Sequence, residues 1–141
     1  LPLPGRAEVV SHEPLVVLDG AHNPDALAAL GRTLDDEFTP AGSRYVVLGM
    51  LAGRQLDAAM ASLASLRPDL LICTTIEGER GIAAQDLAAA CDAAGLPSEW
   101  VADPAAAVSR ALAIAHEEDL VVVTGSFRLL GAARRVVAQQ G

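Results

Sequence analysis

The chain has 141 residues, which fits one domain of ordinary size. Its formal net charge of −8 opposes binding to nucleic acid, because release of counterions from phosphates needs a basic surface. No apolar run approaches the roughly 18 residues of a membrane span and no signal sequence precedes the first elements, so we expect a cytoplasmic protein.

The apolar runs of the chain predict buried strands, each bounded by turn residues. In chain order, they are 15–18 (LVVL), 45–48 (YVVL), 70–74 (LLICT) and 120–124 (LVVVT). Continuous runs of β-branched and aliphatic residues of this length are typical of parallel strands. Two weaker edge strands are expected at 6–10 and within SEWVAD, residues 98–103.

Between the strands, apolar residues recur at helical spacing. This spacing predicts helices around 27–38, 56–63, 83–94, 108–115 and 129–138. Alternating strands and helices imply right-handed crossovers and parallel pairing. We therefore expect an α/β, Rossmann-like fold, with a mostly parallel sheet of about six strands flanked by helices on both faces. No linker divides residues 1–141, so we expect a single domain; the start at Leu1, without a Met, suggests a piece of a longer protein.

An unusual polar cluster, DGAHNP, follows the first predicted parallel strand. Asn23 is suited to cap the next helix and Pro24 to begin it. Gly20 is expected to adopt positive φ in the tight turn. Asp19 and His22 have two explanations that the residue types leave open: Asp19 either bonds turn amides or accepts ligand hydroxyls, and His22 is either a surface residue or a switchable group near phosphate.

Several common site motifs are missing from the sequence. It has no G-x-G-x-x-G after a strand and no P-loop G-x-x-x-x-G-K-[ST]. The three histidines and two cysteines lack metal-ligand spacing, so we expect no metal site, and the free cysteines favour an intracellular protein. Ser126 follows another predicted strand in VTGSF, where it either caps the last helix or binds a ligand carboxylate.

Four segments resemble, in order and spacing, the C-terminal domain of the folylpolyglutamate synthase/dihydrofolate synthase family, in the Mur ligase superfamily. They are LPGRAEVV, VVLDGAHNPDALAAL, VVLGML and VVVTGSFRLLGAAR, and DGAHNP is the most specific part. The resemblance implies an ATP-dependent amide ligase. In such enzymes a carboxylate of folate or pteroate is phosphorylated by ATP, and the amino group of L-glutamate attacks the acyl phosphate.

The resemblance also implies roles for individual residues. Arg6 is similar to a catalytic arginine that reaches the nucleotide phosphates. Asp19 resembles the residue that contacts the ATP ribose, and His22 a catalytic residue close to the nucleotide. Asn23 is implied to shape the same nucleotide-binding turn. Ser126 is similar in position to a residue at the glutamate end of the site.

The chain also departs from this family pattern. Arg54 in AGRQLD stands near a family lysine, and Phe127 and Arg128 replace a leucine and a tyrosine. The P-loop and the Mg²⁺-binding residues belong to an N-terminal domain of the family that is absent here, so we expect the chain alone to be inactive. The alternatives are a stand-alone Rossmann-like binding or scaffolding module without ligase activity, and a ligase acting on peptidoglycan precursors.

Overall fold

The computed structural model describes residues 5–38, 42–53 and 56–140. Its centre is a six-stranded sheet in the order β1-β2-β6-β3-β4-β5. Only β1 runs antiparallel to its neighbour, and the other pairs are parallel. The strands, in chain order, are β1 (Glu8–His12), β2 (Leu15–Leu18), β3 (Arg44–Leu48), β4 (Leu70–Cys73), β5 (Ser98–Trp100) and β6 (Leu120–Thr124).

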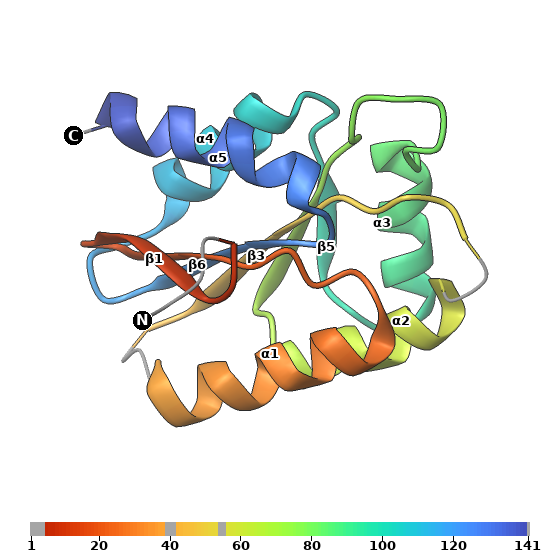
Figure 1. Cartoon of the computed structure of the whole chain (residues 1–141), viewed down its shortest axis with the longest axis horizontal. Coiled ribbons are helices and arrows are strands. Elements are labelled where there is room, and N and C mark those ends of the chain that lie inside the picture. The colour runs from red at the N-terminus through yellow and green to blue at the C-terminus, as the bar shows by residue number, and fades with distance from the viewer. Residues whose placement is uncertain (1–4, 39–41, 54–55, 141) are drawn as a thin grey trace.

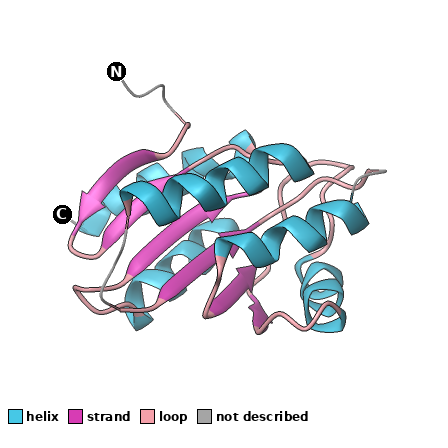
Figure 2. Cartoon of the chain, turned by 90° about the horizontal axis from the view of Figure 1, so that it is seen from below, coloured by secondary structure: helices cyan, strands magenta, loops and turns pink. Residues whose placement is uncertain are grey.

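Helices cover both faces of this sheet (Figures 1 and 2). On one face lie α1 (Pro24–Glu37), α2 (Leu56–Leu63), a short 3-10 helix (Ala64–Leu66) and α3 (Ala84–Ala93). On the other face lie α4 (Pro104–Ile114) and α5 (Phe127–Gln140). The expected fold class, an α/β sheet that is mostly parallel with helices on both faces, is confirmed.

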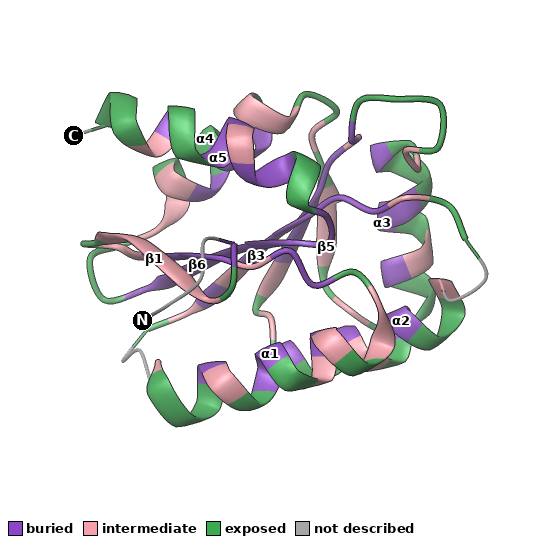
Figure 3. Cartoon of the chain, viewed as in Figure 1, coloured by how far each residue is buried: buried purple, intermediate pink, exposed green. Residues whose placement is uncertain are grey.

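The central strands are buried because each of their two faces packs against helices (Figure 3). In β6, Val122 belongs to the core with α1 and α3, whereas Val121 and Val123 belong to the core with α4 and α5. Alternate side chains of a strand point to opposite faces, so a continuous valine run supplies both cores. The aliphatic composition of the chain therefore matches a two-sided core.

The structure refines several predicted boundaries. The first edge strand lies at 8–12, not 6–10, because residues 5–7 form a turn that contains the positive-φ residues Gly5 and Ala7. The strand within SEWVAD ends at Trp100, and the Asp103 carboxylate instead caps α4 by accepting the Ala106 amide hydrogen bond (2.9 Å). Consequently α4 begins at Pro104, earlier than the predicted 108. Over the residues described, no helix combines the length and apolar character needed to cross a membrane.

Candidate functional site

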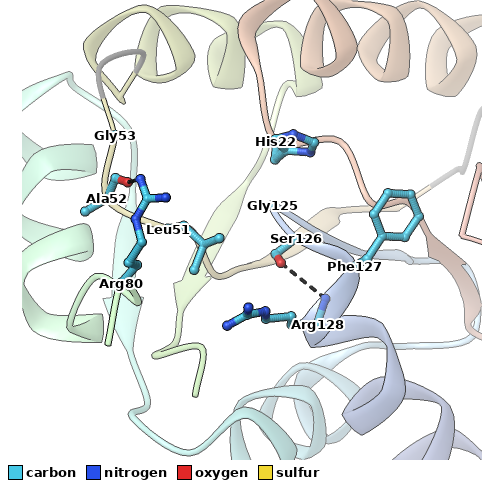
Figure 4. A pocket seen from close by; sticks show the side chains of 9 residues that line it. All are labelled: His22, Leu51, Ala52, Gly53, Arg80, Gly125, Ser126, Phe127 and Arg128. Atoms are coloured by element: carbon cyan, nitrogen blue, oxygen red, sulfur yellow. Dashed lines mark hydrogen bonds between the residues drawn. The ribbon is translucent and has the colours of Figure 1, made fainter. Parts of the chain in front are cut away.

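Two adjacent cavities open at the edge of the sheet where the parallel strands end. The smaller cavity, about 450 Å³, is lined by residues of the β2–α1 turn, of α1 and of the 5–7 segment: Arg6, Ala7, Asp19, Gly20, Ala21, His22, Asn23, Ala26, Ala29, Leu30, Thr33 and Phe127. The larger cavity, about 650 Å³, is lined by His22, Leu51, Ala52, Gly53, Arg80, Gly125, Ser126, Phe127 and Arg128 (Figure 4). His22 and Phe127 line both cavities.

The carboxylate of Asp19 joins two segments of the chain. Its Oδ1 accepts a hydrogen bond from the Ala21 amide (2.8 Å), and its Oδ2 accepts one from the Ala7 amide (2.9 Å). Burial raises the pKa of Asp19 above its ordinary value, and the two amide hydrogen bonds and the charge of Arg6 oppose that rise. Asp19 thus bonds turn amides, as one of the two explanations held, while it also faces the smaller cavity.

Gly20 is required for close approach rather than for positive φ. The prediction of positive φ is wrong, because the described glycines with that conformation are Gly5, Gly78, Gly95 and Gly125. A Cβ atom on Gly20 would lie 2.6 Å from three atoms of the Phe127 ring. The glycine therefore makes room for an aromatic side chain from the far end of the sequence.

The other two residues of the polar turn have distinct roles in its geometry. Asn23 is the N-cap of α1, and its side-chain oxygen accepts the Ala26 amide hydrogen bond (2.8 Å), as predicted. The exposed His22 places Nδ1 3.2 Å from the Gly20 carbonyl oxygen. Since a carbonyl only accepts, Nδ1 carries the proton in this contact and Nε2 is left for another partner.

Ser126 lies at the start of α5 in the larger cavity. It is buried, and its hydroxyl oxygen accepts the Arg128 amide hydrogen bond (3.2 Å), which is the capping interaction predicted as one alternative. Gly125, directly before it, has φ +108°, and a Cβ atom at this position would clash with the Gly49 carbonyl oxygen. This tight turn fixes the serine at the cavity wall.

Two arginines of this cavity received no site role from the sequence, although Arg128 was noted as a departure from the family pattern. Arg80 lies in the loop between β4 and α3, and its guanidinium donates to the Ala52 carbonyl (2.8 Å). Arg128 belongs to the first turn of α5 and donates to the Glu77 carbonyl (3.3 Å). Figure 4 shows them entering from different elements, with His22 across the cavity. Residues 76–81 read as an ordinary loop in the sequence, and only a positive charge in a loop after a parallel strand could have indicated Arg80.

The structure thus brings most of the predicted site residues together. Arg6, Asp19, His22 and Asn23 line one cavity, although Arg6 comes from a different segment. Ser126 lies in the adjacent cavity, next to His22. Arg54, the other departure from the family pattern, lies outside the described residues. Among the described residues, no group of three or more His, Cys, Asp or Glu side chains is placed to hold a metal ion.

Comparison with known proteins gives the family. The family described as "Mur ligase, glutamate ligase domain" matches residues 5–127. The chain belongs to this family. One relative, a probable bifunctional folylpolyglutamate synthase/dihydropteroate synthase of Haloferax volcanii, is 36% identical over 134 residues, which are 93% of this chain and 15% of the relative. The predicted resemblance to folylpolyglutamate synthases is thereby confirmed.

Solved structures of such synthases share the fold. E. coli FolC in complex with DHPP and ADP superposes with a TM-score of 0.87 and 32% identity, over 98% of this chain and 32% of that chain. A bifunctional folylpolyglutamate synthase/dihydrofolate synthase with Mn, AMPPNP and L-glutamate bound superposes with a TM-score of 0.83 and 34% identity, over 99% of this chain and 32% of that one. The chain therefore spans about a third of the length of these two structures. It spans a smaller share of the Haloferax volcanii relative.

Proposed function

We propose that this chain is the part of an ATP-dependent amide ligase that closes over the nucleotide and binds L-glutamate, which the enzyme adds to folate or dihydropteroate. The observation that carries the proposal is the convergence of Arg6, Asp19, His22 and Asn23 on one cavity. That cavity lies beyond the carboxyl ends of parallel strands, where α/β proteins bind ligands. Membership of the glutamate ligase family supports the class of reaction.

The smaller cavity has the chemistry to hold part of ATP. Its volume of about 450 Å³ is within the range of small-molecule sites. The exposed Arg6 guanidinium suits phosphate oxygens, which it can bind through two parallel hydrogen bonds. Each carboxylate oxygen of Asp19 accepts one amide and has a further lone pair for a ribose hydroxyl. His22 lines the same cavity and offers Nε2 as a further hydrogen-bonding atom.

The larger cavity suits the amino-acid substrate. L-glutamate carries two carboxylates, and the guanidiniums of Arg80 and Arg128 line this cavity together with the Ser126 hydroxyl. Arg–carboxylate pairs combine charge with directional hydrogen bonds and so fix orientation as well as affinity. Because His22 and Phe127 separate this space from the smaller cavity, the amine would be held next to the nucleotide end of the site.

The remaining parts of the reaction must come from outside these 141 residues. The sequence has no P-loop, so we propose that a P-loop ATPase domain supplies the triphosphate and Mg²⁺ sites and that residues 1–141 form one closing domain. Closure would exclude water from the reactive intermediate. The isolated chain is then expected to be inactive. The thiols of Cys73 and Cys91 are buried and free, with a hydrogen bond between sulfur atoms that lie 3.9 Å apart, and they support a cytoplasmic location.

A chimera tests this proposal. The chain replaces the matching third of E. coli FolC, and ATP-dependent joining of L-glutamate to dihydropteroate is followed by mass spectrometry and ADP release. We expect an active chimera in which Arg6→Ala lowers kcat about 100-fold, the scale of losing one donor to developing charge. Arg32→Ala, which removes an exposed arginine of α1, is the matched control. A folded chimera without ligation, or equal rates for the two variants, contradicts the proposal.

A further inference from the structure

Phe127 is an exposed aromatic residue with an unusual set of contacts. The residue is 54% exposed although it begins a helix that packs against the core. The ring borders both cavities of the site.

The Phe127 ring packs against two glycines from separate segments of the chain. A Cβ atom added to Gly5 would lie 2.8 Å from a ring carbon, and one added to Gly20 would lie 2.6 Å from three ring atoms. The backbones of Gly5 and Gly20 are also joined directly, because the Gly20 amide donates to the Gly5 carbonyl (2.8 Å). Phe127 therefore covers the place where the 5–7 segment meets the Asp19–Asn23 turn.

The 5–7 segment needs such support because its backbone is strained. Gly5 has φ +73° and Ala7 has φ +46°, and the latter is a left-handed conformation that a residue with a Cβ rarely adopts. The Ala7 amide is held by Asp19, and the Gly5 amide by the Glu8 carboxylate (2.8 Å). Strained backbone persists only where surrounding contacts enforce it, and here the ring is one of them.

We propose that Phe127 is a positioning residue that holds the 5–7 segment, and with it Arg6, against the nucleotide side of the site. The role of Arg6 toward phosphate rests on the proposed function above. The positioning of the 5–7 segment by Phe127 is inferred from the ring's contacts alone. Gly5 and Gly20 are the two positions that let the ring approach. The first residue of the last helix thereby controls a residue near the start of the chain.

Amide hydrogen exchange of the ligand-free chain tests whether Phe127 holds the 5–7 segment in place. The reporters are the Ala7 and Gly20 amides, whose bonds join the two segments. We expect Phe127→Ala to speed exchange at both about tenfold, the scale of losing one aromatic contact. Phe127→Tyr, which keeps the ring, should restore slow exchange. Trp100→Ala, at another exposed aromatic residue, should leave both amides unchanged. Unchanged exchange in Phe127→Ala overturns the proposal.

A double-mutant cycle tests whether the effect reaches Arg6. AMPPNP affinity is measured for the wild-type chain, Phe127→Ala, Arg6→Ala and the double variant. We expect Phe127→Ala to weaken binding about tenfold in the wild-type background and to have no further effect when Arg6 is already lost. Equal weakening in both backgrounds overturns the positioning role. If the wild-type chain fails to bind AMPPNP even with a P-loop ATPase domain added, the proposed function is contradicted, and the exchange result alone decides whether Phe127 holds the 5–7 segment.

Discussion

Replacing Asp19 by Ala is the perturbation whose outcome the structure predicts in most detail. The carboxylate accepts hydrogen bonds from the Ala7 and Ala21 amides, and both bonds are partly buried. Hydrogen bonds to a charged group contribute about 1.5–3 kcal/mol each. Removal of the carboxylate also relieves the burial that raises its pKa, which offsets part of the loss. We expect Asp19→Ala to lower the free energy of unfolding by about 2–4 kcal/mol.

Urea unfolding followed by far-UV circular dichroism measures this change. A loss of that size shifts the midpoint by roughly 1–2 M urea while the slope stays constant. Glu117→Ala removes one exposed carboxylate from the loop before β6 and is the matched control for charge. A loss below about 0.5 kcal/mol, the usual range for surface substitutions, would refute the structural role of Asp19.

Three further outcomes follow from single contacts. Gly125→Ala should destabilise the chain by more than about 2 kcal/mol in urea unfolding. The backbone there has a positive φ, and the added Cβ atom would clash with the Gly49 carbonyl oxygen. A smaller loss of stability would contradict this turn geometry. Ser126→Ala should cost about 1 kcal/mol through loss of the α5 cap, and Ser126→Asp should recover most of it. Hydrogen bonds from Arg134 and from the Gly5 amide hold the pKa of Glu8 below its ordinary value of 4.5. The stability that Glu8 adds is therefore complete above its unfolded pKa and is lost as pH falls through the lowered pKa. The difference in unfolding free energy between wild type and Glu8→Gln should be constant at neutral pH and shrink in acid; a difference independent of pH would exclude this linkage.

Much of the fold could be predicted from local sequence signals. The valine and leucine runs located four central strands, because two-sided burial leaves no polar alternation to confuse the pattern. Boundaries were less accurate where polar residues had two possible roles. Asp103 was assigned to a strand, but its carboxylate caps α4, a function that depends on the backbone conformation around it.

The site was only partly accessible from the sequence. The turn at Asp19–Asn23 is local, so its cap and its helix start could be predicted. The contact between Gly20 and Phe127 joins residues 107 positions apart in sequence, and no local pattern carries it. The position of Arg80 likewise depends on how the loop after β4 folds back onto the Leu51–Gly53 segment, through a bridge between Leu51 and Gly81.

The most direct test of the central claim is a titration of AMPPNP with Mg²⁺ into the ¹⁵N-labelled chain, followed by amide chemical shifts. The account predicts that the largest shifts occur in residues 5–7 and 19–23, around Arg6, Asp19 and His22, and that Arg6→Ala reduces them. Shifts confined to the opposite edge of the sheet, or no shifts at millimolar nucleotide even with a P-loop domain added, would contradict it.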